Sequence, residues 1–245
     1  MTASLQGRVA WIHGAGGALG RAIAAELAGR GARVVLSGRD AARLHAAADA
    51  LPLAGRDAAL VLPADVRDDA AVRATLAQLL QQAGRLDFLV NSTTLPLFGD
   101  LLALDDAAWH AVLDTKILGY VRTLRAVLPH LAQQGHGAVV NITGRGGRQP
   151  HAVHLPGGAA NAAVNLITKG LADQYGPRGV RVNAVAPGPI RSERLDALAQ
   201  AGGSTATAAG EPADIAQAVA FLLSDAARHI NGTVLAVDGG SLATV

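Results

Sequence analysis

Cysteine is absent from this chain, which excludes both a disulfide framework and a thiolate metal site. Aromatic residues make up only 3% of the 245 residues, too few for a nucleic-acid surface built from stacking rings. Charged residues make up only 16%, and their formal net charge of +2 is not gathered into a run of basic residues. We therefore expect no nucleic-acid partner and no metal site.

Long apolar runs are missing as well. No stretch approaches the roughly 18 uninterrupted apolar residues of a membrane span. Residues 1–7 lack a basic segment followed by an apolar one, so we expect no secretory signal. These absences predict a cytoplasmic protein with no membrane partner. Half of the residues are nevertheless hydrophobic, which is enough for a large buried core.

What the sequence does contain is a regular alternation of two patterns. Short runs rich in β-branched residues lie at 8–13, 33–37, 59–63, 86–91, 138–143, 180–186 and 233–237. Ala- and Leu-rich helical patterns lie between them, at 19–30, 40–51, 68–83, 105–134, 157–175 and 212–224. Strands that are apolar throughout and separated by helices are typical of a parallel sheet covered on both faces. We predict an α/β fold: a single doubly wound Rossmann domain over residues 1–245, with a seven-stranded parallel sheet in the order 3-2-1-4-5-6-7.

One stretch late in the chain, residues 199–210, is rich in Ala, Gly, Ser and Thr and interrupts two helical patterns. We expect a mobile substrate loop around residues 189–211. A plain surface connection is the alternative.

A glycine-rich turn follows the first predicted strand and precedes the first predicted helix. Small residues there let the backbone turn sharply and approach a pyrophosphate, while the helix start offers free N–H groups. The expected contacts come from Gly14, Gly16, Gly17, Ala18, Leu19 and Gly20. Its place at the first strand–helix junction favours dinucleotide binding over a merely tight turn.

This turn resembles the Thr-Gly-x-x-x-Gly-x-Gly motif of the short-chain dehydrogenase/reductase family, with His13 in place of Thr and Ala18 in place of the middle Gly. The resemblance extends over essentially the whole chain, through Asp65-Val66, Asn91, Pro187-Gly188, Asn231-Gly232 and Asp238-Gly239-Gly240. It implies that Asp65 and Val66 meet the adenine ring and that Asn91 belongs to the cofactor site. It also implies that Pro187, Gly188, Ile190 and Ser192 surround the nicotinamide. Helix capping or turn stabilisation is the alternative for Asp65 and Asn91.

The end of the second predicted strand bears on cofactor choice. Proteins that bind NAD usually have a carboxylate there, which accepts a hydrogen bond from the ribose 2′-hydroxyl. This chain reads Ser37-Gly38-Arg39, a missing carboxylate beside a guanidinium. That pattern favours a 2′-phosphate, so we expect NADP(H) over NAD(H), with Arg39 as the contact. A solvent-facing Arg39 without this role is the alternative.

The family resemblance also implies where the chemistry lies. Its members use a Ser after the fifth strand, a Tyr-x-x-x-Lys on the next helix, and an Asn on the helix before. Here the Ser position is Gly144 and the Tyr position is Gly157. The Lys position is Asn161, and the Asn position is Lys116. Lys116 and Asn161 thus occupy each other's usual places, as in ketoreductase domains of polyketide synthases. Since the only lysines are Lys116 and Lys169, we expect Lys116 and Asn161 to serve both catalysis and cofactor binding.

Gly157 cannot donate a side-chain proton, so the usual acid is absent. His154 lies three residues earlier, and imidazole titrates in the range needed for acid–base work. We name His154 as the candidate replacement; an ordinary loop histidine is the alternative. Loss of a general acid typically lowers a rate by about 10²- to 10⁴-fold.

Three functions remain open on the sequence alone. The first is an NAD(P)(H)-dependent oxidoreductase with altered proton delivery, acting on a small carbonyl or alcohol substrate. The second is a catalytically silent NADP(H)-binding protein. The third is a non-redox enzyme that uses Lys116 as a base or Schiff-base amine. The family resemblance also implies a homodimer or homotetramer, formed through the helices at 105–134 and 157–175 and the C-terminal segment.

Overall fold

A computed structural model describes residues 4–52, 59–200 and 209–242. Its centre is a seven-stranded sheet in the order β3-β2-β1-β4-β5-β6-β7, in which every pairing is parallel. This confirms the predicted fold class and strand order. The strands are β1 (Val9–His13), β2 (Arg33–Ser37), β3 (Leu60–Val61), β4 (Phe88–Asn91), β5 (Gly137–Ile142), β6 (Val180–Pro187) and β7 (Val234–Val237).

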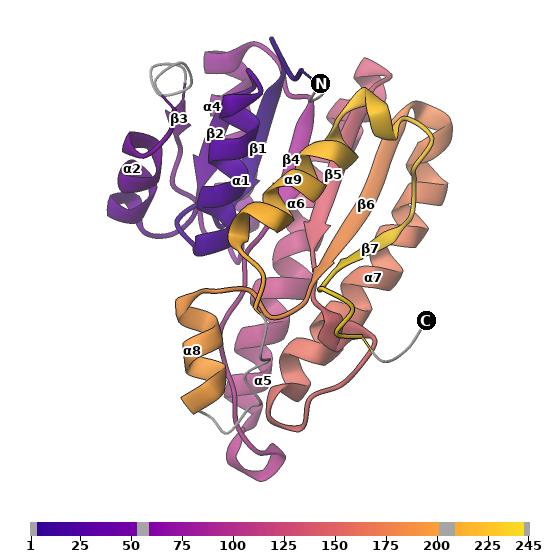
Figure 1. Cartoon of the computed structure of the whole chain (residues 1–245). Helices are drawn as coiled ribbons and strands as arrows, with labels where there is room; N and C mark the ends of the chain where they lie inside the picture. The colour runs from indigo at the N-terminus through magenta and orange to yellow at the C-terminus, as the bar shows by residue number, and fades with distance from the viewer. Residues whose placement is uncertain (1–3, 53–58, 201–208, 243–245) are drawn as a thin grey trace.

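Helices cover both faces of the sheet (Figure 1). They are α1 (Ala18–Gly29), α2 (Ala41–Asp49), α4 (Asp69–Ala83), α5 (Asp106–Leu113), α6 (Gly119–Gln134), α7 (Leu155–Tyr175), α8 (Glu193–Gln200) and α9 (Pro212–Leu223). α1 and α9 pack against each other on one face, while α4, α6 and α7 cover the other. No helix of the described residues is long and apolar enough to cross a membrane.

Alternation along the strands divides the core between these two faces. Ala10 and Ile12 of β1 pack with α1 and α9, whereas Val9 and Trp11 of the same strand pack with α4, α6 and α7. Because successive side chains of a strand point to opposite sides, both sets must be apolar for both faces to be buried. This explains the unbroken hydrophobic runs in the sequence.

Aspartates begin three of the helices. The side chains of Asp40, Asp68 and Asp105 each accept a hydrogen bond from the backbone N–H three residues later, at the starts of α2, α4 and α5. α1 is different: the residue before its first turn is Gly17, which provides no side-chain cap, and the first turn contains no acidic residue. The unpaired N–H groups of the first turn of α1 therefore remain available to a ligand.

Two features of the fold differ from the sequence prediction. The helix expected over 105–134 is interrupted by a π-helical turn, Asp114–Leu118, between α5 and α6. The expected loop around 189–211 contains the helix α8, and a bridge between Ile190 and Gly210 closes the base of the loop. The remainder of that loop, residues 201–208, lies outside the described residues.

Candidate active-site cleft

A cleft of about 640 Å³ lies where the turns after β1, β4, β5 and β6 meet. These turns follow the carboxyl ends of the strands, the edge at which open α/β sheets bind ligands. Figure 1 shows α8 and α5 beyond this edge of the sheet. Most of the expected site residues line the cleft: Gly14, Gly16, Gly17, Ala18, Leu19, Gly20, Lys116, His154, Asn161, Pro187, Gly188, Ile190 and Ser192.

The glycine-rich turn forms one wall of the cleft. Gly14 has a φ of +77°, and a Cβ there would lie 2.7 Å from the backbone carbonyl of Ser92. Its N–H donates to the Ser37 carbonyl at 2.9 Å, which ties the turn to the end of β2. Only glycine satisfies both the conformation and the close approach. The result is a fixed turn that directs the start of α1 into the cleft, where its N–H groups and dipole suit an anion such as a pyrophosphate.

Four residues expected at the cofactor site, Arg39, Asp65, Val66 and Asn91, are not part of the cleft wall. Arg67 holds both carboxylate oxygens of Asp65 at 2.7 to 3.1 Å, and these hydrogen bonds lower the pKa of Asp65 below its usual value. Arg39 is exposed, and its charge also contributes to lowering that pKa. Val66 is buried against Gly119.

Asn91 is fully buried beneath the cleft. Its amide donates to Asn141 Oδ1 at 3.0 Å and its oxygen accepts from the Thr123 hydroxyl at 2.9 Å. Asn141 in turn donates to Thr168 at 3.0 Å. This chain of hydrogen bonds joins β4, β5, α6 and α7, so the side chain of Asn91 supports the floor of the cleft.

Lys116 enters the cleft from the π-helical turn and is only 3% exposed. Its ammonium donates to the Thr143 carbonyl at 3.3 Å and lies 5.9 Å from the ring centre of Tyr120. The Tyr120 hydroxyl lies within hydrogen-bond distance of the carbonyls of Thr93 and Ile142. Tyr120 is therefore a buried support for this region, and Lys116 brings a positive charge to the cleft.

His154 lies at the start of α7 and is 9% exposed. Its ring packs against Phe98 with the centroids 4.8 Å apart, and its Nδ1 lies 3.3 Å from the Leu97 carbonyl. Because a carbonyl oxygen only accepts, Nδ1 carries the proton in this contact, and proton exchange is left to Nε2. A Cβ on Gly157 would overlap Cε1 and Nε2 of this ring.

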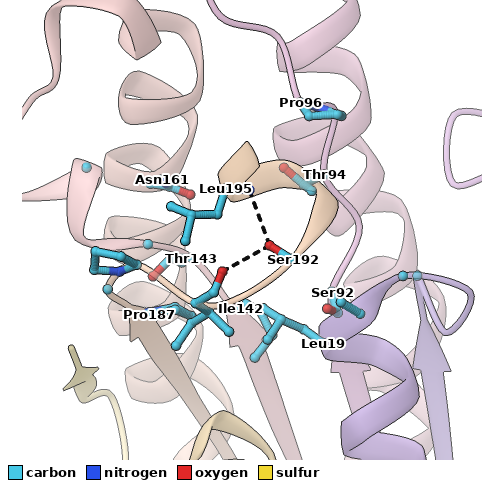
Figure 2. A pocket seen from close by; sticks show the side chains of 18 of the residues that line it. Leu19, Ser92, Thr94, Pro96, Ile142, Thr143, Asn161, Pro187, Ser192 and Leu195 are labelled. Atoms are coloured by element: carbon cyan, nitrogen blue, oxygen red, sulfur yellow. Dashed lines mark hydrogen bonds between the residues drawn. The ribbon is translucent and has the colours of Figure 1, made fainter. Parts of the chain in front are cut away.

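Asn161 lies one helical turn after Gly157 and is 3% exposed. Its Oδ1 is buried and has no hydrogen-bond partner among the described residues. A Cβ on Gly144 would lie 2.8 Å from its Nδ2. Figure 2 shows Asn161 and Thr143 on one side of the pocket and Leu19 and Ser92 on the other.

Sequence reasoning did not identify several lining residues: Arg43, Ser92, Thr94, Pro96, Arg145, Gln149, His151 and Leu195. Arg43 lies beside Gly16, on the first turn of α2, and its proximity to the glycine-rich turn has no local sequence signal. Leu195 belongs to α8. Ser192, just before this helix, accepts a hydrogen bond from the Leu195 N–H at 3.4 Å and donates one to the Ile190 carbonyl at 3.0 Å (Figure 2). No group of three or more His, Asp or Glu side chains among the described residues is placed to hold a metal ion.

Comparison with known proteins gives a consistent result over nearly the whole chain. Residues 14–241 match a family model described as enoyl-(acyl carrier protein) reductase. The chain is 33% identical to the peroxisomal 2,4-dienoyl-CoA reductase of Rattus norvegicus, covering 98% of this chain and 86% of the relative. It is 35% identical to the galactitol 2-dehydrogenase (L-tagatose-forming) of Cereibacter sphaeroides, covering 96% and 95%.

Solved structures agree with this. A short-chain dehydrogenase from Burkholderia cenocepacia J2315 in complex with NADP is 33% identical, with a TM-score of 0.87, covering 96% of this chain and 98% of that one. A 3-ketoacyl-(acyl-carrier-protein) reductase from Brucella melitensis complexed with NADH is 29% identical, with a TM-score of 0.89 and coverages of 97% and 99%.

Proposed function

This chain belongs to the short-chain dehydrogenase/reductase family, and we propose that it is an NADP(H)-dependent oxidoreductase for a small carbonyl or alcohol substrate, with altered proton delivery. The observation that carries the proposal is the continuity of the cleft. One cavity runs from the glycine-rich turn to Lys116, Asn161 and His154. A dinucleotide held by the turn thus reaches the groups able to act on a substrate.

The phosphate end of the cleft supports a dinucleotide. Gly17 starts α1 without a capping side chain, and Gly16 and Gly17 lie in the cleft wall. A Cβ on Gly17 would meet nothing nearer than 3.4 Å, so the space above it is open to a phosphate. At the other end, the backbone of Pro187 and Gly188 and the loop through Ile190 and Ser192 hold the nicotinamide.

Two arginines support a preference for the 2′-phosphate. Arg39 follows Gly38 where NAD-binding proteins usually carry a carboxylate. Arg43, on the first turn of α2, lines the cleft and forms long ion pairs with Asp40 and Glu193, at 3.8 and 3.9 Å. The guanidinium groups of Arg39 and Arg43 each offer a fork of donors that suits a phosphate.

When bound, the reduced dinucleotide supplies the two electrons and the carbon-bound hydrogen of a carbonyl reduction. Lys116 places a positive charge near the reacting oxygen. The Lys116 ammonium is held in position by its hydrogen bond to the Thr143 carbonyl. His154, with Nδ1 bound to the Leu97 carbonyl, exchanges the proton of that oxygen at Nε2. One named relative, a galactitol 2-dehydrogenase that forms L-tagatose, interconverts an alcohol and a carbonyl, and this is the substrate class that we carry over here.

Dinucleotide titration by calorimetry tests the cofactor part of the proposal. We expect NADP⁺ and NADPH to bind about 10- to 100-fold more tightly than NAD⁺ and NADH, since charge-assisted hydrogen bonds contribute about 1.5 to 3 kcal/mol each. Arg39→Ala should remove most of this preference while leaving NADH binding unchanged. Arg33→Ala is the matched control, since Arg33 lies at the opposite end of β2. Absence of heat with all four dinucleotides would overturn the proposal.

Turnover is tested with NADPH and a panel of ketones, aldehydes and acyl thioesters, followed by the loss of NADPH absorbance. Oxidation of NADPH that falls at least about tenfold in Lys116→Met supports the oxidoreductase. Tight NADPH binding without turnover on any substrate would instead indicate a silent binding protein. Borohydride trapping of a carbonyl compound on Lys116 would indicate the non-redox alternative.

We extend the proposal to the molecule as a whole in three respects. The residues 1–245 act as one catalytic unit, and the loop around 189–211 borders the substrate through residues 189–195, which line the cleft. The chain works as a homodimer or homotetramer, in which helices α6 and α7 form the contact. An apolar stripe on the exposed side of α7, composed of Ala159, Ala162, Leu166 and Gly170, supports that contact.

A further inference from the structure

We propose that the two side chains missing at positions 144 and 157 have been relocated rather than lost: the Asn161 amide takes the space above Gly144, and the His154 imidazole takes the space above Gly157. The relocated pair, defined as His154 and Asn161, binds the reacting oxygen of the substrate. This inference rests on the proposed function and specifies how its proton delivery is achieved.

The first half of the argument concerns Gly157. A Cβ built on Gly157 would overlap Cε1 and Nε2 of His154 and lie 2.8 Å from Nδ1. The ring therefore stands where a side chain at 157 would leave the helix. Phe98 packs against the ring and the Leu97 carbonyl holds Nδ1, so the imidazole is fixed in this place by two contacts. A group that exchanges protons is thus present, although it arises three residues earlier in the chain.

The second half concerns Gly144. A Cβ there would lie 2.8 Å from Asn161 Nδ2, closer than such atoms normally approach. The amide therefore fills the space in which a hydroxyl on residue 144 would begin. Asn161 lines the cleft, is 3% exposed, and has a buried Oδ1 without a partner among the described residues. An amide N–H₂ supplies the donor that a serine hydroxyl would supply.

The two relocated groups lie close together. Gly157 and Asn161 are four residues apart on α7, which places them on the same face of the helix with Cβ positions about 5 to 6 Å apart. Since the His154 ring covers Gly157, the imidazole and the amide are neighbours along this face. Both residues line the same cavity as Lys116.

Close packing of the 144–147 loop on α7 is the competing explanation for these glycines. Neighbouring glycines show what that packing looks like. A Cβ on Gly158 would meet the backbone oxygen of Gly146 at 3.0 Å. One on Gly147 would meet the backbone of Ala162 and Asn161 at 2.9 and 3.0 Å, together with Asn165 Nδ2 at 2.8 Å. At Gly144 and Gly157, in contrast, the three nearest atoms all belong to one polar side chain, that of Asn161 or of His154, and none of them is a backbone atom. The contact between the loop and the helix accounts for Gly147 and Gly158. Gly144 and Gly157 are instead explained by the relocated side chains that lie over them.

The chemical step assigned to the pair is a proton transfer. In the direction of reduction, the oxygen that becomes the alcohol accepts a proton from Nε2 of protonated His154, which is left neutral and is protonated again from water. The electrons and the carbon-bound hydrogen come from the reduced dinucleotide of the proposed function. Asn161 donates a hydrogen bond to the same oxygen and stabilises its charge as it develops.

A double-mutant cycle tests the relocation at position 157. Gly157→Tyr alone should lower the melting temperature and weaken NADPH binding, because the new side chain displaces the His154 ring. Adding His154→Gly should restore both quantities, since it vacates the space that the introduced phenol needs. Gly29→Tyr is the control, because a Cβ on this exposed glycine of α1 meets nothing within 4 Å. Equal destabilisation in the single and double variants would overturn the claim about space.

Chemical rescue tests the role of the ring. His154→Gly should lower turnover about 10²- to 10⁴-fold, and free imidazole should restore part of it by entering the space above Gly157. A purely structural role would give no rescue.

A second double-mutant cycle tests position 144. Gly144→Ser alone should lower the melting temperature, and the decrease should be much smaller when Gly144→Ser is combined with Asn161→Ala.

The outcomes separate this inference from the proposed function. Wild-type turnover that persists in His154→Gly would overturn the relocated pair and leave the oxidoreductase intact. If the wild type neither binds nor oxidises NADPH, the proposed function fails, and the assigned proton transfer fails with it. The melting temperatures of the cycle still decide whether His154 occupies the space of a residue-157 side chain.

Discussion

At the scale of single residues, His13 is the most unusual group beside the glycine-rich turn. It ends β1, is fully buried, and neither ring nitrogen has a hydrogen-bond partner among the described residues. Its ring lies 4.3 Å from that of Trp11, whose indole N–H donates to Ser37 at 2.8 Å. Burial lowers the pKa of His13 from 6.5 to about 3, so the ring is neutral in the folded protein at neutral pH.

A pH dependence of stability follows from this shift. Between pH 6.5 and about 3, His13 is protonated in the unfolded chain but remains neutral in the folded chain. The free energy of unfolding therefore decreases as the pH falls through this window, and His13 does not affect it above pH 6.5. The slope approaches about one tenfold change in the folding equilibrium constant per pH unit. His13→Leu should remove the slope and, by removing unpartnered polar atoms, raise stability by about 1 to 3 kcal/mol at about pH 5.

Urea unfolding at about pH 5 and about pH 8, on either side of the ordinary histidine pKa, measures this effect. The control is His45→Leu, on α2, where the side chain is exposed and should leave the pH dependence unchanged. An undiminished slope in His13→Leu would show that other groups produce it.

At this scale the sequence predicts which residues belong to the site, but it does not predict where their side chains lie. The motifs of the sequence predict that Gly144, Gly157, Lys116 and Asn161 depart from the family pattern. That the His154 ring covers Gly157 depends on the backbone at the start of α7 and on Phe98, which lies far earlier in the chain. No local pattern carries such a contact.

At the scale of elements, Arg181 shows how a strand residue completes a helix. Its guanidinium donates to the carbonyls of Leu222, Leu223 and Ser224 at the end of α9, at 2.6 to 3.2 Å, and weakly to that of Ile230. These are the carbonyls that a helix end leaves unpaired, and the positive charge also suits the negative end of the helix dipole. β6 and α9 are thereby joined.

Arg181→Met should destabilise the protein by about 3 kcal/mol, because it leaves several half-buried carbonyls without donors. Arg181→Lys should recover only part of this loss, since an ammonium cannot reproduce the guanidinium fork. Chemical denaturation measures both variants. Arg228→Met, a change at an exposed arginine nearby, should be nearly neutral. A neutral Arg181→Met would refute the capping role.

Elements were predicted well where the pattern is long and apolar, and poorly where packing sets the geometry. The strand order followed from the alternation of strands and helices, while β3 covers only Leu60–Val61, where a strand over 59–63 was predicted. The π-helical turn at 114–118 had no sequence signal. It lies where Gly119 packs against Val66. A Cβ on Gly119 would lie only 2.7 Å from Val66 Cγ2. α8 was hidden by the Ala-, Gly-, Ser- and Thr-rich composition that follows it.

At the scale of the whole molecule, the exposed side of α7 raises the question of assembly. Leu166 is 77% exposed at the centre of the apolar stripe, and Leu118, at the junction with α6, is 47% exposed. Exposed apolar side chains of this size gathered on neighbouring long helices are typical of a surface that a second copy covers.

Leu166→Glu should weaken self-association at least about tenfold, because a symmetric contact would bring two new carboxylates together. Light scattering combined with size-exclusion chromatography measures the mass. Leu102→Glu is the control: Leu102 is 94% exposed but lies on a separate loop, at residues 101–103, and its change should leave the mass unaffected. A monomeric wild-type protein would contradict the proposed homo-oligomer.

The overlap between Gly157 and His154 makes the two positions dependent on each other. A large side chain at 157 leaves no room for the imidazole in its present position. A single substitution that adds a side chain at 157 is therefore obstructed while His154 is present, and the two positions can change only together.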